Sequence, residues 1–95
     1  MQDEIFRSNS KRLMTALGAV IKEKRILQNK TMYAISAEAS MSKSTWREVE
    51  LGICNDVKLT TLWKIAEGLG MPLSDLIKET AVRLGEDFSL TDLEQ

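Results

Sequence analysis

Residues 31–52, TMYAISAEASMSKSTWREVELG, decide the fold, because they encode two short helices joined by a tight turn. In the first half, Ile35 and Ala39 lie four residues apart and give one apolar face to a helix of roughly two turns. Thr31 offers a hydroxyl that can cap the start of this helix, which we expect to end near Ser40. The first half is therefore predicted to be a short amphipathic helix.

The second half of this stretch predicts another helix, over residues 43–51. Ser42 is a favourable N-cap, and Gly52 can adopt the left-handed conformation that closes a helix. Trp46 and Val49 would then face inward. The outward side of this helix would consist of polar residues, which are Lys43, Ser44, Arg47 and Glu48.

Amphipathic patterns on both sides of this stretch complete an all-α chain. Apolar residues recur at three- and four-residue steps over residues 10–27, 59–69 and 73–84, and strand-like alternation is absent. We therefore expect five helices. Trp46 and Trp63 are in phase with aliphatic neighbours, which places both tryptophans in the predicted core.

We predict one domain, residues 13–84, with an N-terminal extension over residues 1–12 and an acidic tail over residues 85–95. Charge is unevenly distributed along this chain. Residues 7–47 carry nine basic and two acidic groups, a net charge of +7. Residues 48–95 carry four basic and ten acidic groups, a net charge of −6. Although the total charge is −1, this asymmetry allows one face to meet a polyanion.

The residue inventory argues against enzymatic chemistry. The chain has no histidine and a single cysteine, Cys54, which excludes an intrachain disulfide, a thiolate–imidazole pair and a Cys/His zinc cage. We therefore predict a protein that is not an enzyme and needs no cofactor. No apolar run reaches membrane-spanning length, and the N-terminus lacks the pattern of a signal peptide, so we expect a cytoplasmic protein without a membrane partner.

Four short motifs, in order along residues 13–77, resemble the Cro/C1-repressor (XRE-type) helix-turn-helix family. The matching residues are Leu17, Gly18, Ile21, Lys22, Arg25, Thr31, Ile35, Ala39, Met41, Ser42, Trp46, Val49, Glu50, Gly52, Leu59, Thr61, Leu62, Lys64, Ile65, Ala66, Leu69 and Gly70. The resemblance implies a five-helix, lambda-repressor-like DNA-binding domain whose third helix docks in the major groove. Four positions depart from the family pattern: Lys30 replaces a leucine, Met32 a phosphate-binding glutamine, Ser40 the glycine of the turn, and Val57 the proline of the loop after Gly52.

The resemblance also implies roles for individual side chains. In this docking geometry the outward residues of the third helix read base edges, and these are Lys43, Ser44, Arg47 and Glu48. The expected phosphate contacts are Lys30, Thr31, Ser42 and Thr45, and the expected structural ion pair is Arg25 with Glu50. A solvated polar face is the alternative for the first group, and helix capping alone is the alternative for Ser42 and Thr45.

These observations predict a transcriptional regulator, in particular a repressor, that binds a palindromic operator in double-stranded DNA as a homodimer. A single small domain covers too little DNA for tight binding. The dimer surface is expected on the last two helices and the tail, from apolar residues that a small core cannot absorb: Leu73, Leu76, Ile77, Val82, Leu84 and Phe88. The alternative is an antitoxin or other protein-interaction module of the same fold that binds a partner protein through residues 86–95.

Overall fold

A computed structural model describes residues 2–91 as five α-helices, and it contains no strand in this range. In chain order these helices are α1 (Gln2–Leu27), α2 (Met32–Glu38), α3 (Lys43–Leu51), α4 (Leu59–Leu69) and α5 (Leu73–Leu84). The expected all-α, five-helix fold is confirmed. None of the helices in residues 2–91 is both long and apolar enough to cross a bilayer.

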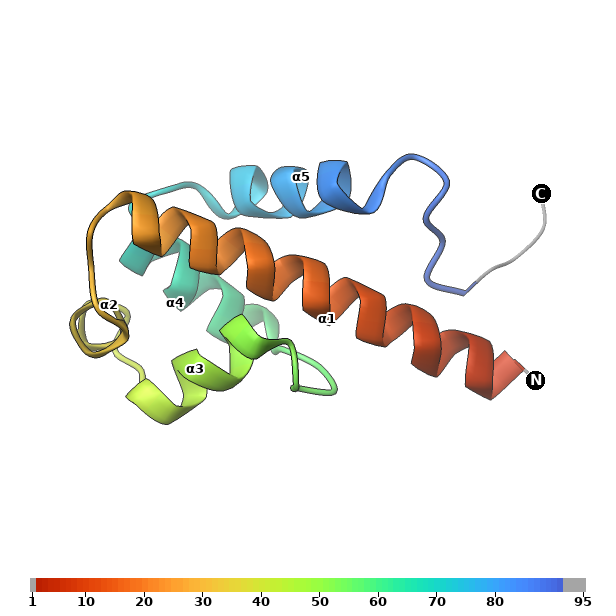
Figure 1. The fold of residues 1–95 in the computed structure, drawn as a ribbon, viewed down its shortest axis with the longest axis horizontal. Coiled ribbons are helices and arrows are strands. Elements are labelled where there is room, and N and C mark those ends of the chain that lie inside the picture. The colour runs from red at the N-terminus through yellow and green to blue at the C-terminus, as the bar shows by residue number, and fades with distance from the viewer. Residues whose placement is uncertain (1, 92–95) are drawn as a thin grey trace.

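The first helix is longer than the sequence pattern predicts. We expected it to begin near Ser10, but α1 begins at Gln2 and runs along the whole length of the molecule (Figure 1). No glycine or proline lies in residues 2–9, and Asp3 and Glu4 in the first turn of α1 interact favourably with the positive end of the helix dipole. The boundary expected after residue 12 thus falls inside a continuous helix.

The segment after α5 turns back and lies against the N-terminal half of α1. The side-chain amide of Asn9 donates a hydrogen bond to the Leu90 carbonyl at 3.2 Å, and the Arg12 guanidinium stands 5.1 Å from the centre of the Phe88 ring. These contacts support the early turns of α1, which lie beyond the other helices in Figure 1. The end of the predicted tail, residues 92–95, lies outside the described residues.

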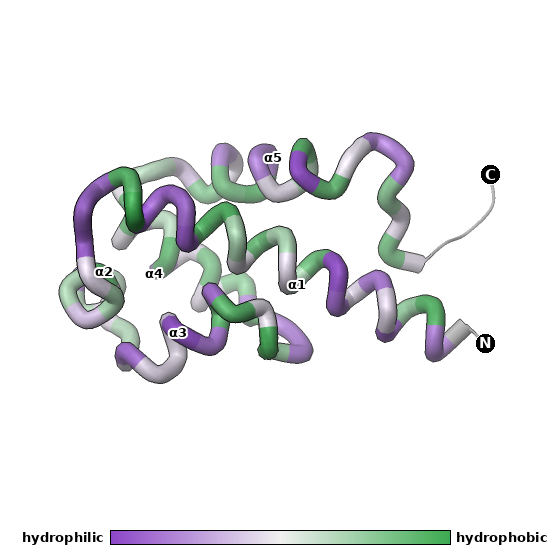
Figure 2. The backbone as a smooth tube through the Cα atoms, viewed as in Figure 1, coloured by the Kyte–Doolittle hydropathy of each residue, from purple (hydrophilic) through white to green (hydrophobic). Residues whose placement is uncertain are grey.

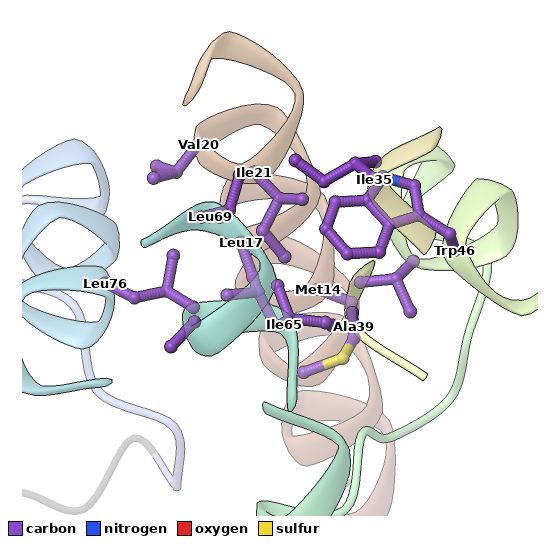
Figure 3. Close-up of a cluster of buried hydrophobic side chains, with 12 residues drawn as sticks. Met14, Leu17, Val20, Ile21, Ile35, Ala39, Trp46, Ile65, Leu69 and Leu76 are labelled. Carbon is purple, nitrogen blue, oxygen red and sulfur yellow. The ribbon is translucent and has the colours of Figure 1, made fainter. Parts of the chain in front are cut away.

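A single apolar cluster holds the five helices together. Trp46 from α3 and Leu76 from α5 enter it from opposite sides, and both are 0% exposed (Figure 3). The core position predicted for Trp46 is confirmed. The prediction that placed Leu76 at a dimer surface is wrong, because this side chain fills the contact of α5 with the core.

The prediction that Trp63 lies in the core is also wrong, because this side chain is 54% exposed. Along α4 the buried positions are Ile65, Ala66 and Leu69, which share one face of the helix. Trp63 lies on the adjacent stripe with Leu59, which is 62% exposed. Apolar residues therefore cover more of α4 than the core needs.

Candidate nucleic-acid interface

Two side-chain caps and a left-handed residue build the turn between α2 and α3. Thr31 Oγ1 accepts a hydrogen bond from the Ala34 N–H, and Ser42 Oγ accepts one from the Thr45 N–H, each at 3.1 Å. Ser40, between the two helices, has a φ of +56°. Each cap satisfies a backbone donor that a helix start otherwise leaves unpaired. The chain therefore reverses within a few residues, and α3 begins at the surface.

The buried side of α3 determines which of its residues face solvent. Trp46, Val49 and Glu50 are buried, so the opposite side of the helix is turned outward. Figure 2 shows α3 as a largely hydrophilic helix with an apolar C-terminal end. The four residues expected to read bases are all exposed and have no ion pair or side-chain hydrogen bond within residues 2–91: Lys43, Ser44, Arg47 and Glu48.

These four residues form one exposed face of α3, spread over about 140° of rotation. At about 100° of rotation per residue, Lys43 and Arg47 lie on the flank of α3 that is turned to α1, and Ser44 points directly outward. Glu48 follows Ser44 by one helical turn and lies about 40° from it around the axis, on the side where burial and then the negative charge of Glu48 raise the pKa of the Cys54 thiol. The exposed face therefore carries its two cations on the side of α1 and Glu48 on the opposite side.

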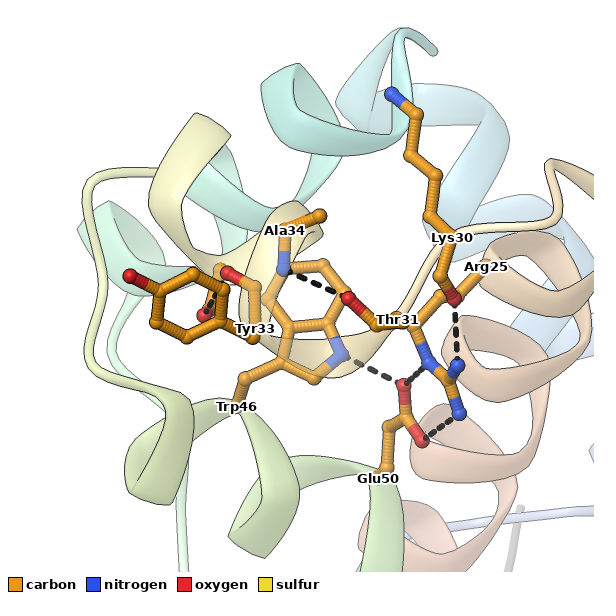
Figure 4. A network of polar contacts seen from close by, with 8 residues as sticks. Arg25, Lys30, Thr31, Tyr33, Ala34, Trp46 and Glu50 are labelled. Carbon is orange, nitrogen blue, oxygen red and sulfur yellow. Dashed lines mark hydrogen bonds and ion pairs between the residues drawn. The ribbon is translucent and has the colours of Figure 1, made fainter.

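A buried polar network fixes α3 against α1 (Figure 4). The Arg25 guanidinium donates from Nε to Glu50 Oε2 at 2.6 Å and from Nη2 to Oε1 at 3.1 Å. A third bond runs from Arg25 Nη1 to the Lys30 carbonyl at 2.8 Å. Hydrogen bonding to Glu50, opposed in part by burial, raises the pKa of Arg25. One guanidinium thus links α1, the chain before α2, and α3.

Trp46 takes part in the same network, which sequence reasoning missed. Its indole Nε1–H donates to Glu50 Oε2 at 2.6 Å, so this buried carboxylate oxygen accepts from both Trp46 and Arg25. The available signal was the spacing, since residues four apart on a helix are neighbours and a buried indole N–H needs an acceptor. Trp46 therefore both fills the core and orients Glu50.

The residues expected to contact phosphate are already engaged within the chain. Lys30 Nζ pairs with Glu38 Oε1 at 2.6 Å, and both side chains are partly exposed. Thr31 caps α2, whereas the Ser42 hydroxyl caps α3 and also donates to Thr45 Oγ1 at 2.8 Å. All three hydroxyl-bearing residues remain exposed. An anion can therefore still reach these hydroxyl groups. Helix capping alone, however, also explains why Thr and Ser occupy these positions.

Another basic residue, Lys22, lies beside α3. It shares one stripe of α1 with Gly18 and Arg25, and both of these residues contact α3. A Cβ added to Gly18 would come within 2.4 Å of the Val49 carbonyl oxygen, so the two helices touch at this point. By contrast, Lys24 pairs with Glu79 of α5 at 2.8 Å. Lys22 therefore adds positive charge next to α3.

The same helical arrangement occurs in crystal structures of the clp gene regulator ClgR from Corynebacterium glutamicum. One ClgR structure aligns with a TM-score of 0.70 and 24% sequence identity, covering 79% of this chain and 96% of that chain. Another aligns with a TM-score of 0.68 and 26% identity, covering 74% and 73%. No protein-family model and no curated protein sequence matches the chain. The similarity establishes the fold.

Proposed function

We propose that this protein is a sequence-specific regulator of transcription that binds double-stranded DNA and reads the major groove with α3. The observation that carries the proposal is the exposed group formed by Lys43, Ser44 and Arg47, none of which has a side-chain partner within residues 2–91. This group sits at the outward N-terminal half of a capped helix that the Arg25–Glu50 network holds in place. The likeness to a gene regulator is consistent with this function.

The chemistry of α3 suits base recognition. Lys43 and Arg47 can donate to the O6 and N7 atoms of guanine, and Ser44 can donate or accept. Glu48, one helical turn after Ser44, can accept from the N4 amino group of cytosine. Each good pair discriminates against a wrong base by about 1–3 kcal/mol.

Phosphate contacts would hold the helix in register. The first backbone N–H groups of α3, next to Ser42 and Thr45, form a favourable end of the helix dipole for an anion. Lys30 and Thr31 provide a second contact from the start of α2. An exposed ion pair such as that of Lys30 with Glu38 contributes about 0–1 kcal/mol, so a phosphate can replace the carboxylate. Lys22 adds positive charge on the side of α1.

A protein of this kind acts most simply by occupying an operator, as a repressor. Two copies related by a two-fold axis would place two α3 helices in successive turns of the major groove, about 34–36 Å apart. The operator would then be palindromic. Dimerisation would also supply the contact area that a single small module lacks.

The test is selection of bound sequences from random duplex DNA, at two salt concentrations. We compare the unmodified protein with Lys43→Ala and Arg47→Ala, and use Lys24→Ala as a matched control because Lys24 faces α5. Loss of preference at one base pair is expected for each of the first two variants, with no such change in the control. Selection that yields no preferred sequence would overturn the proposal, and so would a uniform loss of affinity with intact preference in both α3 variants.

A further inference from the structure

The outer sides of α4 and α5 enclose an apolar groove of about 820 Å³. We call it the Trp63 groove. Its principal lining residues are Trp63, Glu67, Met71, Leu73, Ile77 and Lys78. Trp63 is 54% exposed and Ile77 is 45% exposed. Leu59 extends the apolar stripe one turn towards the start of α4. Large exposed apolar side chains that lie next to one another, one of them a tryptophan, are typical of an interaction surface.

The Trp63 groove lies away from the candidate DNA surface. α5 packs on α1 and α4, whereas α3 packs on α1 and α2. In Figure 1, α5 runs along one side of α1 and α3 lies along the other. A partner in the groove would therefore leave Lys43, Ser44 and Arg47 accessible. The apolar character of the groove also makes it unsuited to bind phosphate itself.

The charges in the groove indicate which partner fits. Glu67 lies on the α4 side and Lys78 on the α5 side, and neither has an ion pair within residues 2–91. An acidic partner would be repelled by Glu67, and a basic partner by Lys78. A second copy related by a two-fold axis can satisfy both, because the interface is then the same patch on each copy and pairs opposite charges twice.

We propose that the Trp63 groove is the docking site for a second copy of this chain, with the Trp63 ring of each copy against the apolar wall of the other. Lys78 of each copy pairs with Glu67 of the other across the two-fold axis. This inference rests on the proposed function, because it names the surface that joins the two copies needed to bind both half-sites of the operator. It corrects the expected dimer surface by removing Leu76 and adding Trp63 at its centre.

Analytical ultracentrifugation of the full chain over a range of concentrations tests the groove without DNA. We expect a monomer–dimer equilibrium that Trp63→Ala weakens by about tenfold or more. Leu27→Ala serves as the matched control, because Leu27 is an exposed apolar side chain at the far end of α1 from residue 2 and outside the groove. Circular dichroism establishes that each variant is folded.

A charge exchange distinguishes a second copy from any other occupant. Glu67→Lys alone and Lys78→Glu alone should each weaken the dimer several-fold, and the double variant should recover it. A chain that stays monomeric at every concentration would overturn the proposal, as would a double variant no stronger than the single ones. A monomer that still selects a half-site refutes only the groove, whereas a dimer without sequence preference refutes only the DNA function.

Discussion

Replacing Trp46 with phenylalanine measures how much the indole N–H contributes to the attachment of α3. Trp46 is 0% exposed, and its Nε1–H donates to Glu50 Oε2 at 2.6 Å. Phenylalanine keeps an aromatic ring in the core but removes the donor. Glu50 Oε2 still accepts from Arg25, so the carboxylate is not left without a partner. The change therefore removes one charge-assisted hydrogen bond and a modest volume.

The expected cost follows from these two losses. A hydrogen bond to a charged group contributes about 1.5–3 kcal/mol, and the space left by the smaller ring adds roughly 1 kcal/mol. Trp46→Phe should therefore lower the free energy of unfolding by about 2–4 kcal/mol. A domain of this size is stable by about 5–10 kcal/mol, so the variant should remain folded at room temperature.

Urea denaturation followed by circular dichroism checks this value. With a slope of about 2 kcal/mol per molar urea, the midpoint should fall by about 1–2 M. Tyr33→Phe is the matched control, because Tyr33 is 73% exposed and its hydroxyl has no hydrogen bond in the described part of the chain. If both variants lowered the midpoint equally, the bond from Trp46 to Glu50 would not contribute as argued.

The other predictions concern close contacts, strain and one thiol. Gly18→Ala should destabilise the protein by about 2–3 kcal/mol, because its Cβ would meet the Val49 carbonyl oxygen at 2.4 Å; an unchanged melting temperature would contradict this. Ser40→Gly should raise the melting temperature by about 4–8 °C, since it relieves about 1 kcal/mol of strain at a φ of +56°, and a lower value would refute the strain. Burial and then Glu48 raise the pKa of Cys54, so Glu48→Gln should lower that pKa and speed alkylation by iodoacetamide at a fixed pH near 8. Equal rates would mean that Glu48 has no electrostatic effect on the thiol.

Helix boundaries within residues 31–52 were predictable because local chemistry sets them. Thr31 and Ser42 each bond to an N–H only three residues away, and Gly52 adopts a φ of +69° at the end of α3. Such contacts need no knowledge of the tertiary fold. The start of α1 was not predictable in the same way, because Asn9 and Arg12 are supported by a segment about eighty residues later in the chain.

The two tryptophans show where periodicity fails. Trp46 and Trp63 both recur in phase with aliphatic residues, yet one is fully buried and the other is half exposed. The difference depends on which stripe of each helix meets a neighbour. On α4, Ile65 and Leu69 take the inward stripe, and no helix over residues 2–91 covers the stripe of Trp63. Helix packing angles decide this, and the sequence pattern does not encode them directly.

The exposed residues of the candidate site could be predicted from the sequence, but the ion pair made by Lys30 could not. The caps and the buried positions of α3 are enough to expose Lys43, Ser44 and Arg47. The pairing of Lys30 with a carboxylate on α2 depends on how the chain enters α2, which no spacing rule specifies.

The charge asymmetry along the sequence is partly cancelled by the fold. Lys24 of the basic half pairs with Glu79 of the acidic half where α5 lies on α1, so these two charges neutralise each other. The attraction for a polyanion must therefore come from the few basic groups beside α3 that have no acidic partner. Because exposed charges more than about 8–10 Å apart are largely screened at physiological salt, the placement of these groups matters more for DNA binding than the net charge of −1.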